Sequence, residues 1–116
     1  MRNVHTAPME VFAQIGNGQY ALEPYEAGWA SEALLFVYIR EAHGASPSLT
    51  LTVQISADGS RWINTPHTFG PVSEPGGYSL LVTGFGNWLR LAGEASGGPD
   101  DGSAAFVADF YWVLKD

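Results

Sequence analysis

The sequence predicts an all-β fold, an antiparallel β-sandwich of two sheets. Residues 49–56 alternate strictly between aliphatic and polar side chains, the period of two that places one face of a strand in a core. Only 15% of the 116 residues are charged and 14 are glycine, whereas helices need many charged residues on their wet faces. About seven or eight strands separated by Gly/Pro-rich loops favour a jelly roll first and an immunoglobulin-like topology second.

A tight reversal is expected directly after the strand at 49–56, at Asp58-Gly59. Glycine accepts a positive φ, and aspartate forms hydrogen bonds with its own backbone. The chain should therefore return as a second, antiparallel strand. We expect Pro66 to end this second strand because proline has no backbone N–H, and residues 67–77 to form a loop rich in Gly and Pro.

Four further strands complete the predicted sandwich. Residues 33–40 form an unbroken apolar run, which is typical of a central strand covered on both faces. Residues 78–82 and 88–92 alternate, and so does the last strand at 104–114, whose inward residues should be Ala104, Phe106, Ala108, Phe110, Trp112 and Leu114. The alternation predicts one core that contains Leu51, Val53, Trp62, Leu89, Phe106 and Phe110.

The chain is long enough for a single domain, because a chain of 116 residues can bury about two thirds of the surface that it exposes when unfolded. Residues 33–116 are expected to form the sandwich body. Residues 1–32 lack clear alternation and are expected to form an N-terminal arm with one short strand at 11–15. Deletion of residues 1–20 should then leave the body folded.

Composition argues against several classes of partner and site. The net charge of −7 opposes binding to a nucleic-acid backbone. The absence of cysteine excludes disulfides and thiolate metal sites. No apolar run approaches the roughly 18 residues of a membrane-spanning helix, and the first residues lack a signal-peptide pattern, so synthesis in the cytoplasm and no membrane partner are expected.

No motif in the sequence indicates catalysis, a cofactor or a metal. The three histidines, His5, His43 and His67, lie in separate irregular segments, and no G-x-S-x-G elbow occurs. Residues 16–21 match the pattern G-x-G-x-x-A, but Pro24 falls where the phosphate-binding helix would begin. We therefore interpret 16–18 as a turn and expect no enzymatic activity, no cofactor and no metal.

Aromatic residues outside the predicted core form the candidate interface. They are Tyr20, Tyr25, Trp29, Trp88 and Tyr111. Such residues are typical of a protein interface or a sugar-stacking platform, and half-buried positions at the ends of a sandwich explain them equally well.

Three segments carry a family resemblance. They are LLFVYIREAHG at 34–44, SLTLTVQISADGSRW at 48–62 and NWLRLAGEASG at 87–97, followed by the aromatic terminal strand. Their order over residues 33–114 resembles small β-sandwich virion proteins of tailed bacteriophages, especially head decoration proteins. The resemblance implies a structural protein on the capsid surface of the virion, made in the host cytoplasm, that associates as a trimer and reinforces the shell of major capsid protein.

Similar segments also occur in phage tail modules and in carbohydrate-binding sandwiches. The alternative function is therefore a carbohydrate-binding module with Trp29, Trp88 or Tyr111 as the stacking platform. Retention on a polysaccharide matrix separates the two hypotheses.

Overall fold

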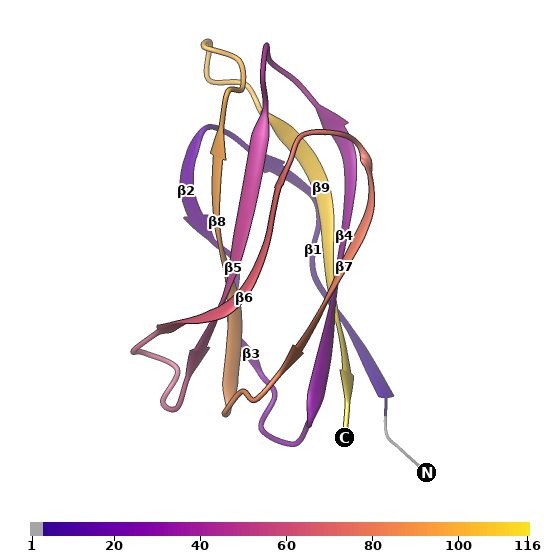
Figure 1. Cartoon of the computed structure of the whole chain (residues 1–116), viewed down its shortest axis with the longest axis vertical. Coiled ribbons are helices and arrows are strands. Elements are labelled where there is room, and N and C mark those ends of the chain that lie inside the picture. The colour runs from indigo at the N-terminus through magenta and orange to yellow at the C-terminus, as the bar shows by residue number, and fades with distance from the viewer. Residues whose placement is uncertain (1–3) are drawn as a thin grey trace.

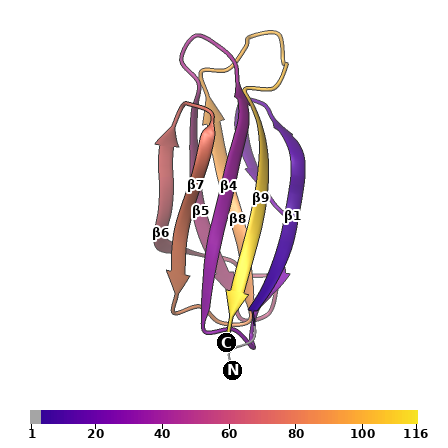
Figure 2. The same ribbon diagram turned by 90° about the vertical axis from the view of Figure 1, so that its right-hand side faces the viewer.

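The computed structural model describes residues 4–116, which form two antiparallel sheets packed face to face (Figure 1). Sheet A has the order β1 (Val4–Ile15), β9 (Phe106–Lys115), β4 (Glu32–Ala42) and β7 (Gly76–Thr83), and faces the viewer in Figure 2. Sheet B has the order β2 (Gly18–Ala21), β8 (Trp88–Ser96), β5 (Ser48–Ser56) and β6 (Ile63–Val72), with β3 (Tyr25–Glu26) also paired to β8. The predicted all-β sandwich is confirmed.

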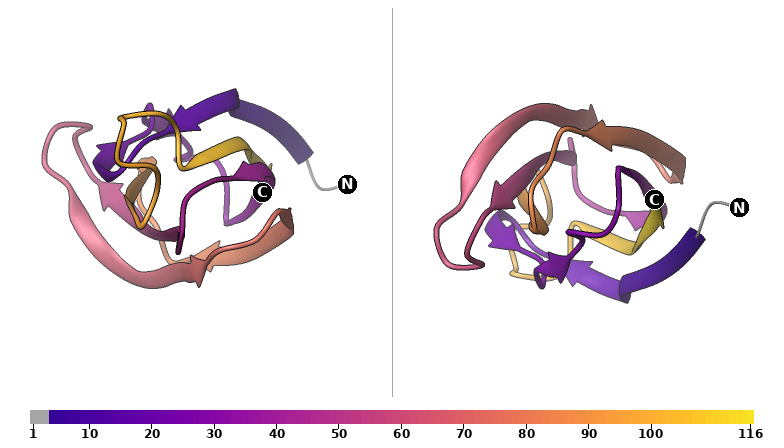
Figure 3. Two further views of the ribbon diagram at one scale, coloured as in Figure 1. Left: turned by 90° about the horizontal axis from the view of Figure 1, so that it is seen from above. Right: turned by 90° about the horizontal axis from the view of Figure 1, so that it is seen from below.

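The core lies between the two sheets and is built from alternate residues of the central strands. On β9 every predicted inward residue from Phe106 onward is fully buried, namely Phe106, Ala108, Phe110, Trp112 and Leu114. Sheet B faces them with Leu49, Leu51, Val53, Leu89 and Leu91, each at most 1% exposed. Viewed from its ends, the sandwich is closed on one side by β6 and β7 (Figure 3). Between these strands the rings of Phe69 and Tyr78 meet edge to face, with their centres 5.4 Å apart.

Trp62 is the one predicted core residue that the structure places elsewhere. Its ring is partly exposed and lies over the guanidinium of Arg90, 4.4 Å from ring centre to Cζ. β5 ends at Ser56 and β6 begins at Ile63, so Trp62 belongs to the loop between them. Side chains alternate between the two faces only within a strand. The prediction that Trp62 faces the core extended this alternation across the loop and was wrong.

The returning strand does not end at Pro66, because β6 continues to Val72. β6 is the edge strand of sheet B, where one side of the backbone needs no partner. The hydroxyl of Thr65 donates to the carbonyl of Val53 at 2.8 Å and accepts from the N–H of His67 at 3.1 Å. The hydroxyl of Thr65 therefore makes the hydrogen bond to β5 that proline cannot make. Because β6 extends to Val72 and β7 begins at Gly76, the loop predicted at 67–77 contains only residues 73–75.

Residues 4–26 are part of both sheets and do not form the expected arm. β1 pairs with β9 from Val4 opposite Lys115 to Ile15 opposite Phe106. Its inward side chains, Ala7, Ala13 and Ile15, are buried, and the predicted turn at 16–18 then leads to β2 and β3 on β8. Removal of residues 1–20 would uncover part of the core, so we no longer expect the remainder to stay folded.

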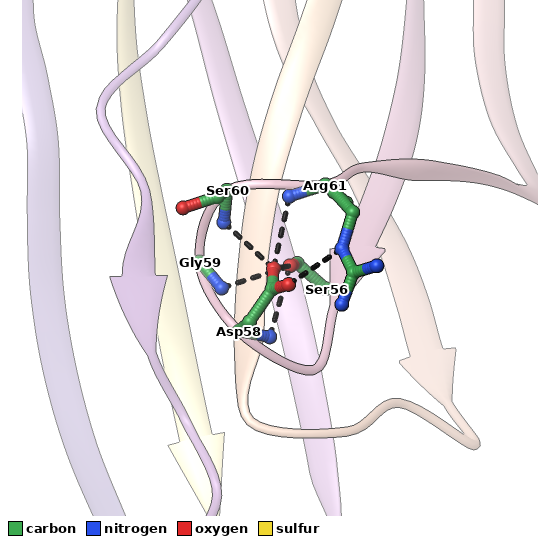
Figure 4. Close-up of polar contacts among 5 residues, drawn as sticks. All are labelled: Ser56, Asp58, Gly59, Ser60 and Arg61. Atoms are coloured by element: carbon green, nitrogen blue, oxygen red, sulfur yellow. Dashed lines mark hydrogen bonds and ion pairs between the residues drawn. The ribbon is translucent and has the colours of Figure 1, made fainter.

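The predicted hairpin between β5 and β6 is present, and Figure 4 shows its hydrogen bonds. The carboxylate of Asp58 accepts bonds from the backbone N–H groups of Arg61 and Ser60, each at 2.9 Å, and from Nε of Arg61 at 2.7 Å. These backbone N–H groups, with the guanidinium, hold the pKa of the Asp58 carboxyl well below its usual range. Gly59 follows at φ +80°, as the turn requires.

Candidate functional site

The outer face of sheet A is apolar, and no third layer of the described chain covers it (Figure 2). We define the apolar face as the outward residues Leu34, Phe36 and Tyr38 of β4, Leu81 of β7, and Tyr111 and Val113 of β9. Tyr38 is 44% exposed and Leu81 is 50% exposed. The expectation that residues 33–40 are covered on both faces is therefore wrong for the outer face.

Cross-strand register brings the aromatic rings of this face together. Phe36 lies directly opposite Tyr111 in the β4–β9 ladder, so their side chains are neighbours on one face. The rings of Phe36 and Tyr38 stack at 6.3 Å, and Tyr38 meets Tyr111 edge to face at 5.9 Å. Together with Thr6 and Val113 they line a shallow hollow of about 420 Å³. The face thus has a rigid aromatic centre, as many protein interfaces do.

A partly buried charge cluster lies at one end of the apolar face. The carboxylate of Asp109, only 6% exposed, accepts bonds from Nε of Arg40 at 2.8 Å and from its terminal amino group at 2.7 Å. Its other oxygen accepts the backbone N–H of Phe12 at 2.8 Å. The hydrogen bonds from Arg40 lower the pKa of Asp109, and those to Asp109 raise the pKa of Arg40.

Phe12 occupies an unusual backbone position in this cluster. It lies in an irregular part of β1, where the register with β9 shifts, and has a φ of +57°. Asp109 satisfies its N–H, and its ring lies 3.8 Å below the guanidinium of Arg40. The ring is 61% exposed, so it extends the apolar surface beyond the face itself.

Two of the five predicted interface residues, Tyr20 and Tyr25, pack against the core. Tyr20 lies opposite Gly93, whose missing side chain leaves room for the ring. Its hydroxyl is buried without a hydrogen-bond partner in residues 4–116, and this burial raises the pKa of Tyr20. Tyr25 is partly exposed and stacks on His5 at 6.3 Å. Tyr20 is therefore not the exposed arm residue that we expected.

The other three predicted residues lie on separate parts of the surface. Trp29 is 46% exposed in the loop between β3 and β4. Trp88 begins β8 and packs its indole against Gly59 of the hairpin. Tyr111 is the only one of the three on the apolar face. The structure thus does not bring Trp29, Trp88 and Tyr111 together as one stacking platform.

Within the described part of the chain, no three His, Asp or Glu side chains are grouped so that they would hold a metal ion. No helix in residues 4–116 is long and apolar enough to cross a membrane.

Comparison with known proteins finds similarity in solved structures. No protein-family model and no curated protein matches the sequence. A chain of the T13 IBDV viral particle has a TM-score of 0.63 at 11% identity, over 98% of this chain and 31% of that one. The SPBc2 prophage-derived protein YomS has a TM-score of 0.56 at 11% identity, over 100% and 96%. The VP2 subviral particle of infectious bursal disease virus has a TM-score of 0.53 at 14% identity, over 98% and 32%.

These neighbours share the β-sandwich fold with this chain. The chain spans about a third of the length of the two viral-particle chains and nearly the whole length of YomS. At such identities the likeness concerns the backbone, and the candidate site must be argued from the residues of this chain.

Sequence reasoning missed most of the apolar face. It selected Tyr111 but not Phe36, Tyr38 or Leu81, because a run that is apolar on both faces was attributed to a doubly covered strand. Two signals were present. The run ends at the charged Arg40, and Asp109 interrupts the apolar residues in the middle of the last strand. A charged residue on the outer face of each of these two strands indicates that no second apolar layer covers this face.

Proposed function

We propose that this chain is a non-enzymatic structural protein of a virus particle, which docks on the outer surface of a tailed-phage head and reinforces contacts between major capsid protein subunits. The apolar face of sheet A carries this proposal. An uncovered sheet face with stacked aromatic rings is costly in water and is favoured against a protein surface.

The fold supports the proposal. Sandwiches with a similar fold occur in chains of viral particles and in a prophage-derived protein. Within the proposal the chain is a trimer in the virion, with its apolar faces against the shell. Binding to the assembled shell, rather than to free capsid protein, is expected because a rigid flat face needs a preformed surface.

The test removes two exposed apolar side chains without touching the core. The double variant Tyr38→Ser, Leu81→Ser is expected to co-sediment with shells of the virus that encodes the chain at least about tenfold more weakly than the parent, since the two side chains supply the accessible apolar area. Ile63→Ser is the matched control, because Ile63 is 66% exposed on β6 of the other sheet.

Each outcome has a clear meaning. Loss of pelleting in the double variant, with a parental melting temperature and normal pelleting of Ile63→Ser, supports the proposal. A parent protein that stays monomeric in light scattering and fails to pellet with these shells contradicts it. A double variant that pellets like the parent shows that the apolar face is not the docking surface.

A further inference from the structure

We propose that the outer face of sheet B binds a neutral polysaccharide in a polar trough. The trough is a hollow of about 530 Å³ that crosses β2, β8, β5 and β6, on the side of the sandwich opposite the apolar face. Its volume is within the range of about 300–1,000 Å³ that is typical of small-molecule sites. The proposal concerns a different surface from the one assigned to the shell and does not depend on it.

The register of sheet B explains the shape of the trough. Arg90, Ala92 and Glu94 all face outward on β8, and because a strand rises about 3.3 Å per residue, Arg90 and Glu94 stand about 13 Å apart. Between them, Ala92 pairs with Thr52 on β5 and with Ala21 on β2. This cross-strand row of small side chains therefore forms the floor of the trough. The two neighbouring cross-strand rows, which contain Arg90 and Glu94, form its walls.

The first wall is fixed by a chain of hydrogen bonds. Nε of Arg90 donates to Oε1 of Gln54 at 2.6 Å, and Nε2 of Gln54 donates to Oδ1 of Asn64 at 2.8 Å. A guanidinium only donates, so Gln54 must present its oxygen to Arg90 and its nitrogen to Asn64. Asn64 must then accept with its oxygen, which leaves its Nδ2 group free to donate.

This wall consequently offers donors to a ligand. Among residues 4–116, neither the terminal amino groups of Arg90 nor Nδ2 of Asn64 has a hydrogen-bond partner. The ring of Trp62 lies over the guanidinium of Arg90 at 4.4 Å and holds it against the sheet. The donors are therefore positioned before a ligand arrives, which reduces the entropy cost of binding.

The second wall offers acceptors. Glu94 is exposed and lies opposite Thr50 on β5 and Gln19 on β2. Its carboxylate has no hydrogen-bond partner within the described residues and can only accept when ionised. The trough thus has donors on one side and an acceptor on the other.

A sugar matches this arrangement because each of its hydroxyl groups both donates and accepts. The flat floor of Ala21, Ala92 and Thr52 suits the C–H face of a pyranose ring. A polyanion would meet the carboxylate of Glu94 and the net charge of −7. The chemistry therefore favours a neutral glycan, and a polymer can extend beyond the trough on both sides.

The experiment reverses one donor of the trough. In native gels that contain dextran, galactomannan or xyloglucan, and on a glycan microarray, the parent protein is expected to bind at least one neutral glycan. Asn64→Asp replaces the free amide donor by an acceptor of the same size, so the Kd should rise about tenfold or more. Gln14→Glu adds the same charge at an exposed position of β1, outside the trough, and should bind like the parent.

Three results would overturn the proposal. They are no neutral glycan bound in either format, stronger retardation by polygalacturonate than by any neutral polymer, and unchanged affinity of Asn64→Asp. The two surfaces are tested separately, because Asn64→Asp should still pellet with shells and Tyr38→Ser, on the apolar face, should still bind glycan. Failure of one proposal is therefore distinguishable from failure of the other.

Discussion

Val53→Asp is expected to abolish cooperative folding of the domain. Val53 is 1% exposed and faces the core from β5, in register with Leu91 on β8. A carboxylate at this position would be buried with no cation beside it, which costs several kcal/mol, against a total stability of about 5–15 kcal/mol for a domain. Circular dichroism and thermal melting measure the loss.

Val4→Asp is the matched control, because Val4 is 59% exposed and lies opposite Lys115. Its stability should change by no more than about 0.5 kcal/mol. If Val53→Asp melts within a few degrees of the parent, the inward face of β5 has been assigned to the wrong side. Val53→Ala provides a milder variant, expected to fold and to melt below the parent.

The sequence allowed correct prediction of those strands whose inward side chains are large. In β5, β9 and residues 88–92 of β8, large inward residues alternate with outward residues that are mostly polar or smaller, so the period of two defines the inward face. Asp58-Gly59 similarly predicted the hairpin, because its chemistry is local to the turn. In these cases the residues that determine the strand pattern or the turn are close to one another in the sequence.

β1 and β6 could not be predicted in this way. β1 buries two small alanines, Ala7 and Ala13, and its register with β9 shifts twice, so no continuous alternation exists in the sequence. β6 contains Pro66, which excludes a central strand but not an edge strand. Whether a strand lies at an edge depends on the order of strands in the sheet, and this order is a tertiary property.

The candidate sites depend even more on tertiary structure. Phe36 and Tyr111 are 75 positions apart in sequence and meet only because β4 and β9 are neighbours. The sequence shows that both faces of β4 are apolar, but it does not show how many layers the fold contains. A second covering layer and an uncovered interface produce the same pattern.

The outer face of sheet A is apolar and that of sheet B is polar, and the alternation of side chains along the strands explains this difference. Outward residues of sheet B include Thr, Gln, Arg and Glu beside small residues such as Ala92, and those of sheet A are largely Leu, Phe, Tyr and Val. The sandwich therefore has one face suited to a protein surface and one suited to a hydrophilic ligand. Asp109 and Arg40 mark where the apolar face ends and link it to β1 through Phe12.

Asp109→Ala is expected to lower the free energy of unfolding by about 2 kcal/mol near neutral pH. The substitution removes the acceptor of the Phe12 N–H and leaves the guanidinium of Arg40 without its partner. Phe12 would then keep a positive φ, which itself costs about 1–2 kcal/mol, with no hydrogen bond to offset it. Urea denaturation measures the change, and hydrogen exchange of the Phe12 amide should become faster. Asp100→Ala, in an exposed loop, is the control and should change stability by less than about 0.5 kcal/mol.

The effect of Asp109 should depend on pH in a defined direction. Hydrogen bonds from Arg40 hold the pKa of Asp109 below the value of about 3.9 of an unfolded aspartate. A carboxyl group whose pKa is lower in the folded state stabilises that state above pH of about 4, and this contribution disappears as the pH falls through the folded-state pKa. The difference in stability between the parent and Asp109→Ala should therefore be largest near neutral pH and should shrink on acidification. A difference that stays constant down to the acid transition would show that the packing of Asp109, and not its charge, anchors β1.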